Sequence, residues 1–249
     1  MGYDRFYEVD GKKYVSVTTI LGIISKGKGF ENWLRKNTEA ESNKLSQEAI
    51  EIGSILHDLI DKWHKGAMFD SALKISDRIT EFMKIKYSDK PSELDMVKVL
   101  PIVELGFKRY CDLWKLRKCE LVETEITVYN NACEYAGTLD RVVKIEGVDG
   151  LVLQDLKTSN GIWEDYWLQV AAYEKAYGSD CAFEILRIDK KTLNIEIADY
   201  MPNGDIKRYS YNGEELKELK IKKSVPKSVL FDLFMCALRL WNWKNYKGE

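Results

Sequence analysis

The chain has 249 residues, 45% hydrophobic and 31% charged, which is an ordinary composition for a globular protein with a sizeable core. Its formal net charge is −2, so a nucleic-acid partner would have to meet local clusters of positive charge. Five scattered cysteines without a Cys-x-x-Cys pair argue against structural zinc and a disulfide framework. No apolar run reaches membrane-spanning length and no signal-peptide pattern opens the chain, so we expect a cytoplasmic protein.

A hairpin is expected at the N-terminus, because Asp10-Gly11 is a strong two-residue turn signal between apolar stretches. Hydroxyl side chains at 16–21 then favour a helix start or a tight turn. The hairpin can cover the core as a sheet edge or lie near a ligand, and the residues favour neither. Phe30 and Trp33 share one helical face, which can be buried or can stack on bases.

Longer helices follow the hairpin. Helical spacing of apolar residues predicts a helix over 46–64 and an all-helical stretch over 70–120, with a break or new start at Pro101. Gly53 and His57 share a face of the first helix, and an internal glycine indicates close approach of another backbone. A single histidine on a helix is usually structural or solvated, so its position on the helix does not by itself identify His57 as a metal ligand.

Two strands joined by a turn form the centre of the prediction. Residues 135–145 and 151–157 read as a hairpin, which brings Asp140 alongside Asp155. Two adjacent carboxylates repel each other unless a divalent cation lies between them. Hard oxygen ligands favour Mg²⁺ or Mn²⁺, so the pair predicts a metal site.

The residues after Asp155 suit phosphoester chemistry. Lys157 shares a strand face with Asp155, where it can orient a water or offset negative charge in the transition state. Gln169 and Tyr173, four apart on the next helix, can support the site through their polar tips. Asp-x-Lys by itself is more often a solvated surface strand, so the prediction depends on all of these residues together with Asp140.

The remaining pattern predicts the fold. Strands at 121–129, 181–190 and 192–200, a helix at 164–177 and a last helix at 229–243 surround the hairpin. We expect an α/β fold with a mixed central β-sheet flanked by helices. The expected parts of one domain, 1–249, are a hairpin and helical N-terminal cap (1–120), a core (121–200) and a C-terminal helical part (201–249). Lysines at 217–227 are interpreted as a solvated helix face or as phosphate contacts.

Three motifs in this order carry a family resemblance: Gly137-Thr-Leu-Asp140-Arg141, Asp155-Leu-Lys157-Thr158-Ser159 and Gln169-Val-Ala-Ala-Tyr173. Together they resemble the PD-(D/E)xK nuclease superfamily, RecB-like branch. The likeness to the mitochondrial genome maintenance exonuclease and its phage relatives extends to further segments, namely Ser16 to Leu21, Trp33, Gly53-x-x-x-His57 and Leu238-Arg239-Leu240. The motifs are specific as a set and weak singly.

This resemblance implies a restriction-endonuclease-like core that hydrolyses DNA with Mg²⁺ or Mn²⁺. It makes His57 a metal ligand and adds a glutamate from strand 121–129, with Glu125 preferred to Glu123, although a solvent-facing glutamate is an equal alternative. It implies catalytic roles for Asp140, Asp155, Lys157, Gln169 and Tyr173. Expected DNA contacts are Thr18, Thr19, Arg141, Thr158, Ser159, Trp163 and Trp167.

The function implied is an exonuclease that acts on single-stranded DNA ends in recombination, repair or replication, in a bacterial or phage-infected cell. Without a cysteine cluster, an iron–sulfur centre is not expected. Three alternatives stay open: a structure-directed or restriction-type endonuclease, a DNA-binding module with an inert site, and a hydrolase of small phosphoesters.

Overall fold

The computed structural model describes residues 4–24, 36, 38–69, 72–86 and 96–246. Within these residues, nine strands form one open mixed sheet and six helices pack against it. The strand order is β1-β2-β4-β5-β6-β7-β8-β9, with β3 on the remaining edge of β4. The α/β class with a mixed, helix-flanked sheet is therefore confirmed.

The N-terminal hairpin forms as expected. β1 (Phe6–Val9) and β2 (Lys12–Ser16) are antiparallel, and the turn residues Asp10 and Gly11 both have positive φ, 51° and 74°. This pair of conformations matches the twist of the flanking strands. Ser16 then caps α1 (Val17–Leu21), accepting a hydrogen bond from the Thr19 amide. The predictions for Phe30 and Trp33 lie outside the described residues.

The helical region differs from prediction at two points. α3 (Glu39–His64) begins seven residues before the expected start at 46, because Thr38 and Glu41 form a reciprocal capping box there. α4 (Ala72–Lys86) and α5 (Met96–Leu116) follow. The predicted break at Pro101 is wrong: α5 runs through this residue, which is exposed, so the lost ladder bond lies on the solvent side.

β3 (Cys119–Asn130), β4 (Tyr135–Ile145) and β5 (Leu151–Lys157) build the centre of the sheet. The predicted β4–β5 hairpin is confirmed, with Arg141 opposite Gln154. β3 pairs with β4 along its whole length, so β2 and β5 must share the other edge of β4. β2 pairs at residues 135–136 and β5 at 141–143, which leaves an opening in the sheet beside 137–140.

The second half of the chain completes the sheet. Its elements are α6 (Glu164–Tyr177), β6 (Cys181–Ile188), β7 (Ile195–Tyr200), β8 (Asp205–Tyr211), β9 (Leu216–Lys223) and α7 (Lys227–Asn245). The prediction that the lysines at 217–227 form a solvated helix face is wrong. Most of them lie on β9, the exposed outer strand. No described helix has the length and hydropathy that crossing a bilayer requires.

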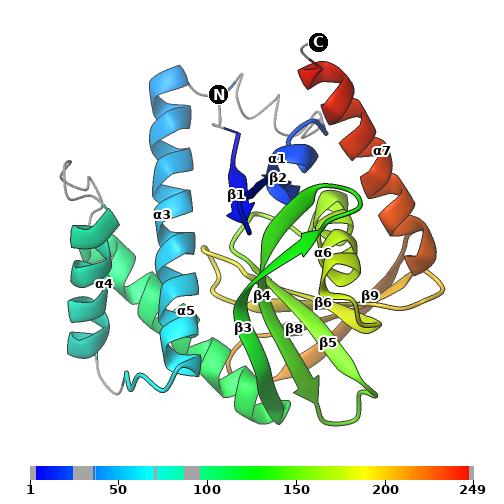
Figure 1. The fold of residues 1–249 in the computed structure, drawn as a ribbon. Helices are drawn as coiled ribbons and strands as arrows, with labels where there is room; N and C mark the ends of the chain where they lie inside the picture. The colour runs from blue at the N-terminus through cyan, green and yellow to red at the C-terminus, as the bar shows by residue number, and fades with distance from the viewer. Residues whose placement is uncertain (1–3, 25–35, 37, 70–71, 87–95, 247–249) are drawn as a thin grey trace.

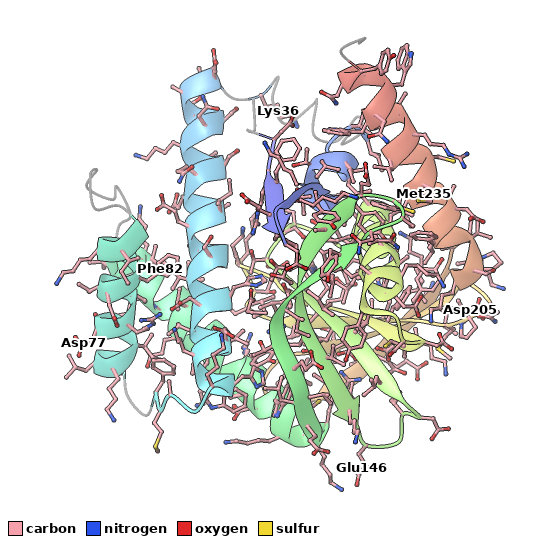
Figure 2. All side chains as sticks on the ribbon, in the orientation of Figure 1. Lys36, Asp77, Phe82, Glu146, Asp205 and Met235 are labelled. Carbon is pink, nitrogen blue, oxygen red and sulfur yellow. The ribbon has the colours of Figure 1, made fainter. Side chains whose placement is uncertain are left out.

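The two larger hydrophobic cores lie on opposite sides of the sheet. One joins the sheet to α1, α6 and α7, and includes Trp167, Phe183 and Phe234. The other joins it to α3, α4 and α5, and includes Leu56 and Phe107. Figure 1 shows α3 to α5 on the left and α7 on the right, with α6 between the strands at the centre and α7. Figure 2 shows side chains crowded between these layers, whereas surface residues such as Asp77 and Glu146 project outward.

Candidate metal centre

Asp140 lies on β4 at the edge of the opening in the sheet. The register puts it next after the Arg141–Gln154 pair, directly across from Asp155. Its Oδ2 accepts a hydrogen bond of 2.7 Å from the Leu156 amide of β5. Asp140 is therefore held by the hairpin itself, and its carboxylate faces the same side of the sheet as Asp155.

Three side chains from three elements meet at this point. His57 of α3, Glu125 of β3 and Asp140 of β4 each offer a ligand atom, and these atoms lie within 4.8 Å of one another. His57 Nδ1 is 3.8 Å from Asp140 Oδ2. Burial lowers the pKa of His57 more than Asp140 raises it, so the imidazole is neutral at neutral pH and has a free lone pair. We call these three residues the open cluster.

Glu125 has an unusual backbone for a strand residue. Its φ is 50°, a left-handed conformation that side-chain-bearing residues seldom adopt. Burial, followed by repulsion from Asp140 and Asp61, raises the pKa of its carboxyl to about 7. Glu123, the alternative, accepts a hydrogen bond from Tyr177 instead. The fold thus brings Glu125 to the cluster and leaves Glu123 outside it.

Asp155 and Lys157 form an ion pair beside the open cluster. Lys157 Nζ is 2.7 Å from Asp155 Oδ2 and donates to Gln169 Oε1 at 3.1 Å. The Gln169 amide in turn donates to Tyr173 at 3.0 Å and more weakly to Asp155 Oδ1 at 3.4 Å. The predicted convergence of these four residues with Asp140 is present, but Asp155 is engaged by Lys157 and is not one of the three clustered ligands.

Two glycines allow the elements to approach. A side chain at Gly137 would collide with the ring of Tyr173. A Cβ at Gly53 would lie 2.5 Å from Thr158 Oγ1, so the close approach expected at this helix glycine is to a side chain and not to another backbone. Without these two glycines, α6 and the loop after β5 could not lie so close to β4 and α3.

The open cluster and Lys157 line a cavity of about 660 Å³. One face of α3 forms a wall, with Ala49, Gly53 and His57, and the N-terminal hairpin contributes Arg5 and Tyr7. The volume lies in the range of small-molecule and cofactor sites. The acidic residues are therefore reachable from solvent.

No family model and no curated protein matches this chain.

The donor set itself fits a divalent cation. Two carboxylates and one neutral imidazole within ligand-sharing distance suit Mn²⁺ or Mg²⁺, with coordination positions left for other ligands. The raised pKa of Glu125 shows that its negative charge is destabilised in the cluster, and its positive φ shows that its backbone is strained. A cation would compensate for the clustered negative charge.

The predicted DNA contacts divide into three groups. Thr18, Thr158 and Ser159 line the cavity. Thr19 instead belongs to the cap of α1, and Trp163 is exposed but is not part of the cavity lining. The third group requires a correction: Arg141 and Trp167 are each only 1% exposed. Alternation along β4 turns Arg141 to the opposite face from Asp140, and Trp167 faces the core between α6 and the sheet, so DNA cannot reach either.

Several residues that line the cavity are not among those predicted from the sequence. Arg5 and Tyr7 line the cavity from the hairpin, and Lys190 does so from the turn between β6 and β7. Asp61, which does not line the cavity, accepts a hydrogen bond from Thr124 and raises the pKa of Glu125. Its spacing of four residues from His57 was a usable signal, because it puts both on one helical face.

Proposed function

We propose that this protein hydrolyses phosphodiester bonds of DNA with Mg²⁺ or Mn²⁺. The observation that carries the proposal is the meeting of His57, Glu125 and Asp140 in an open cavity, immediately beside the buried Asp155–Lys157 pair. The resemblance to the PD-(D/E)xK nucleases uses the same positions. By that resemblance, we favour exonuclease action from single-stranded ends.

The residues of the site have different proposed roles, which follow from where they lie. His57, Glu125 and Asp140 would hold the cation, which in such a site polarises a phosphoryl oxygen and lowers the pKa of a bound water. Asp155 is 1% exposed and lies against Lys157, so its carboxylate orients the amine and adds negative charge next to Asp140. Gln169 fixes both members of the pair through its amide group.

Lys157 acts as a cation and not as a base. Burial lowers its pKa, but attraction to Asp155 and Asp140 and the hydrogen bond to Asp155 outweigh burial, so the pKa is raised and the amine stays protonated. A protonated amine at the cavity wall can donate to a phosphate oxygen or hold a water in line. It also stabilises the negative charge that develops during phosphoryl transfer.

The test is cleavage of end-labelled DNA by the purified protein. Single- and double-stranded oligonucleotides with 5′ or 3′ labels are incubated with Mg²⁺, Mn²⁺ or EDTA. We expect cleavage with either cation and none in EDTA. Asp140→Asn keeps the acceptor for the Leu156 amide but loses a charge, so it should fold and cleave at least about a hundredfold more slowly.

The matched control is Glu123→Gln on the neighbouring strand. This variant removes the same charge outside the open cluster and should keep its activity. Covalently closed circular DNA in a parallel reaction reports endonuclease action, and a chromogenic small phosphodiester reports a small-substrate hydrolase. Undiminished cleavage by Asp140→Asn, or no cleavage of any DNA with either cation, would refute the proposed function.

A further inference from the structure

Lys190 is a cavity residue that the proposed chemistry does not use. It lies in the turn between β6 and β7, half-buried, and its amine donates a hydrogen bond of 3.3 Å to the main-chain oxygen of Ala49 in α3. In the described part of the chain no carboxylate forms an ion pair with it. The other lysine of the cavity, Lys157, forms an ion pair with Asp155.

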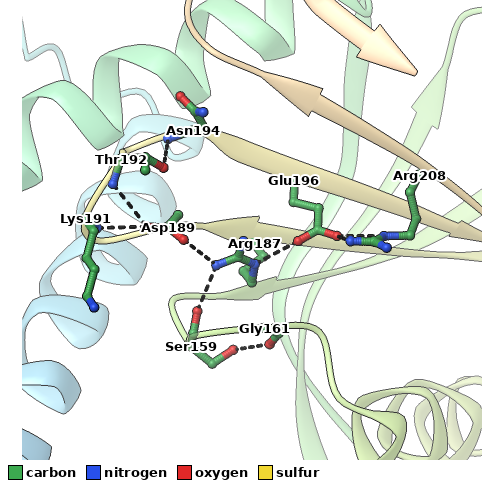
Figure 3. A network of polar contacts seen from close by, with 9 residues as sticks. All are labelled: Ser159, Gly161, Arg187, Asp189, Lys191, Thr192, Asn194, Glu196 and Arg208. Carbon is green, nitrogen blue, oxygen red and sulfur yellow. Dashed lines mark hydrogen bonds and ion pairs between the residues drawn. The ribbon is translucent and has the colours of Figure 1, made fainter. Parts of the chain in front are cut away.

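The turn that carries Lys190 is rigidly held. Asp189 Oδ1 accepts hydrogen bonds from the amides of Lys191 and Thr192, at 2.9 and 3.0 Å. Arg187 donates to Asp189 Oδ2 at 3.0 Å and to the Ser159 oxygen at 3.2 Å, so it connects this turn to the loop after β5 (Figure 3). Lys190 is therefore positioned before any ligand arrives, which lowers the entropy lost on binding.

Arg187 itself is anchored from the other side. Its Nε donates to Glu196 at 3.0 Å, and Glu196 is also paired with Arg208 (Figure 3). Glu196 is buried, so it sets the guanidinium in one orientation. Arg187 thus ties two loops that line the cavity, at Ser159 and at Lys190, to each other and to the sheet.

The amine also lacks the solvation that a surface lysine has. Burial lowers the pKa of Lys190, with only a smaller opposing effect from Asp189. The charged form is destabilised by this burial, and a nearby anion would reverse that effect. A phosphate oxygen is an acceptor of the right charge for such an amine.

The distance along α3 between the Lys190 contact and the open cluster indicates which phosphate Lys190 could bind. Ala49 precedes His57 by eight residues, which at the rise of an α-helix is about 12 Å along the axis. One phosphate cannot contact both ends of that span. The contact must therefore be made by a phosphate other than the one at the open cluster, on the same bound strand.

We propose that Lys190 binds a non-scissile phosphate of the nucleic-acid strand that enters the cavity, and so sets where the strand sits on α3. This inference rests on the proposed function, because it names a second point of contact for the same substrate. The contact contributes to binding and not to the chemical step. Lys191, the next residue, is exposed and does not line the cavity.

The experiment compares Lys190→Met with Lys191→Met. Both variants remove one charge and keep an unbranched side chain. Binding of a fluorescein-labelled oligo(dT) is measured by anisotropy in EDTA between 50 mM and 400 mM salt. Loss of one phosphate contact lowers the salt slope by about 0.7, which corresponds to about fivefold weaker binding near 0.1 M salt. Lys191→Met should match the wild type within twofold.

Two further readouts separate binding from folding. Lys190→Arg keeps the charge, so it should retain most of the affinity and all of the salt slope, whereas a purely structural role for Lys190 would leave the slope of Lys190→Met unchanged. In Mn²⁺, Lys190→Met should raise KM and leave kcat within about twofold. Thermal unfolding of each variant confirms that it is folded at the assay temperature.

The outcomes distinguish this inference from the proposed function. Equal affinity and equal salt slope for Lys190→Met and Lys191→Met, with wild-type protein that binds and cleaves DNA, would overturn the role of Lys190 alone. Wild-type protein that neither binds oligo(dT) nor cleaves DNA would overturn the proposed function and this inference with it.

Discussion

Strands β4 and β5 carry charged side chains on both faces. On one face these side chains are open to a cavity, and on the other they are buried. One face presents the open cluster and the Asp155–Lys157 pair to a cavity. The other carries what we call the closed cluster, made of Arg141, Gln154, Glu184 and Arg117. Single-residue alternation along the same two strands separates them.

The closed cluster is hydrogen-bonded within itself, except for Arg141 Nη2, which is buried without a hydrogen-bond partner among the described residues. Arg141 donates to Gln154 at 2.9 Å, Gln154 to Glu184 at 2.7 Å and Arg117 to Glu184 at 2.5 Å. Arg141, Gln154 and Glu184 are each 1% exposed, so the cluster has no access for a ligand. The open cluster instead gathers two carboxylates next to an imidazole with no cation of the described chain among the three. The sign of the clustered charge and access from solvent, more than polarity, therefore distinguish the cavity site from the buried network.

The largest effect should follow from breaking the closed cluster. Glu184→Ala leaves Arg117 without its partner in the interior, and removing one member of a buried ion pair typically costs about 3–5 kcal/mol. Urea unfolding at pH 7 measures this loss of stability. Glu218→Ala, an exposed glutamate on β9, is the control and should change stability by less than about 0.5 kcal/mol. A loss below about 1 kcal/mol for Glu184→Ala would show that the cluster is not closed in solution.

The second effect is a pH dependence of folding stability, caused by Asp199 beside the closed cluster. Burial, then repulsion by and hydrogen bonding to Glu184, raises the pKa of Asp199 to about 8. The folded state thus keeps a proton that the unfolded chain releases near pH 4, so stability falls as pH rises from about 4 to about 8, by at most about 1.4 kcal/mol per pH unit.

Asp199→Asn removes this dependence, because the amide does not titrate. Unfolding free energies of both proteins, measured from pH 5 to pH 8, should diverge in favour of Asp199→Asn as the pH rises. Parallel curves over that window would mean that Asp199 is ionised in the folded protein.

The smallest effect belongs to the open cluster and has the opposite sign from the first. The raised pKa of Glu125, about 7, means that its charge is destabilising at pH 8 in metal-free buffer. Glu125→Gln should therefore stabilise the protein, by no more than about 1 kcal/mol, because the carboxyl is only partly removed from water and solvent screens the repulsion. Thermal unfolding in EDTA measures the gain, and Glu123→Gln should show none. A destabilised Glu125→Gln would place Glu125 in a structural role.

The fold was most predictable where turn or cap residues mark the ends of an element. β4, β5 and α6 have the expected bounds, because alternation, glycine turns and the C-terminal Gly178 mark them. β8 was not expected and β9 was read as helical, because β9 is exposed on nearly every residue and offers no period-two apolar pattern. The break predicted at Pro101 is wrong, because an exposed proline near the start of a helix removes one backbone hydrogen bond on the solvent side.

The sequence predicts which types of residue form the candidate site, but it does not predict which residue of β3 faces it. The β4–β5 hairpin alone implied that Asp140, Asp155 and Lys157 converge. The choice between Glu123 and Glu125 depends on a bulge near Val122 and on the left-handed backbone of Glu125, which break simple alternation in β3. Lys190 is not predicted from the sequence, because its place depends on the long-range contact between the β6–β7 turn and α3.

The outermost strand of the sheet has a consequence for how copies of this protein meet. β9 carries Lys217, Lys220, Lys222 and Lys223 along a ladder edge that no described strand covers. An uncovered edge invites pairing with the same edge of another molecule, yet such pairing here would align rows of ammonium groups and repel. We therefore expect concentrated solutions to stay free of sheet-mediated aggregates at low ionic strength, and added salt to weaken that protection.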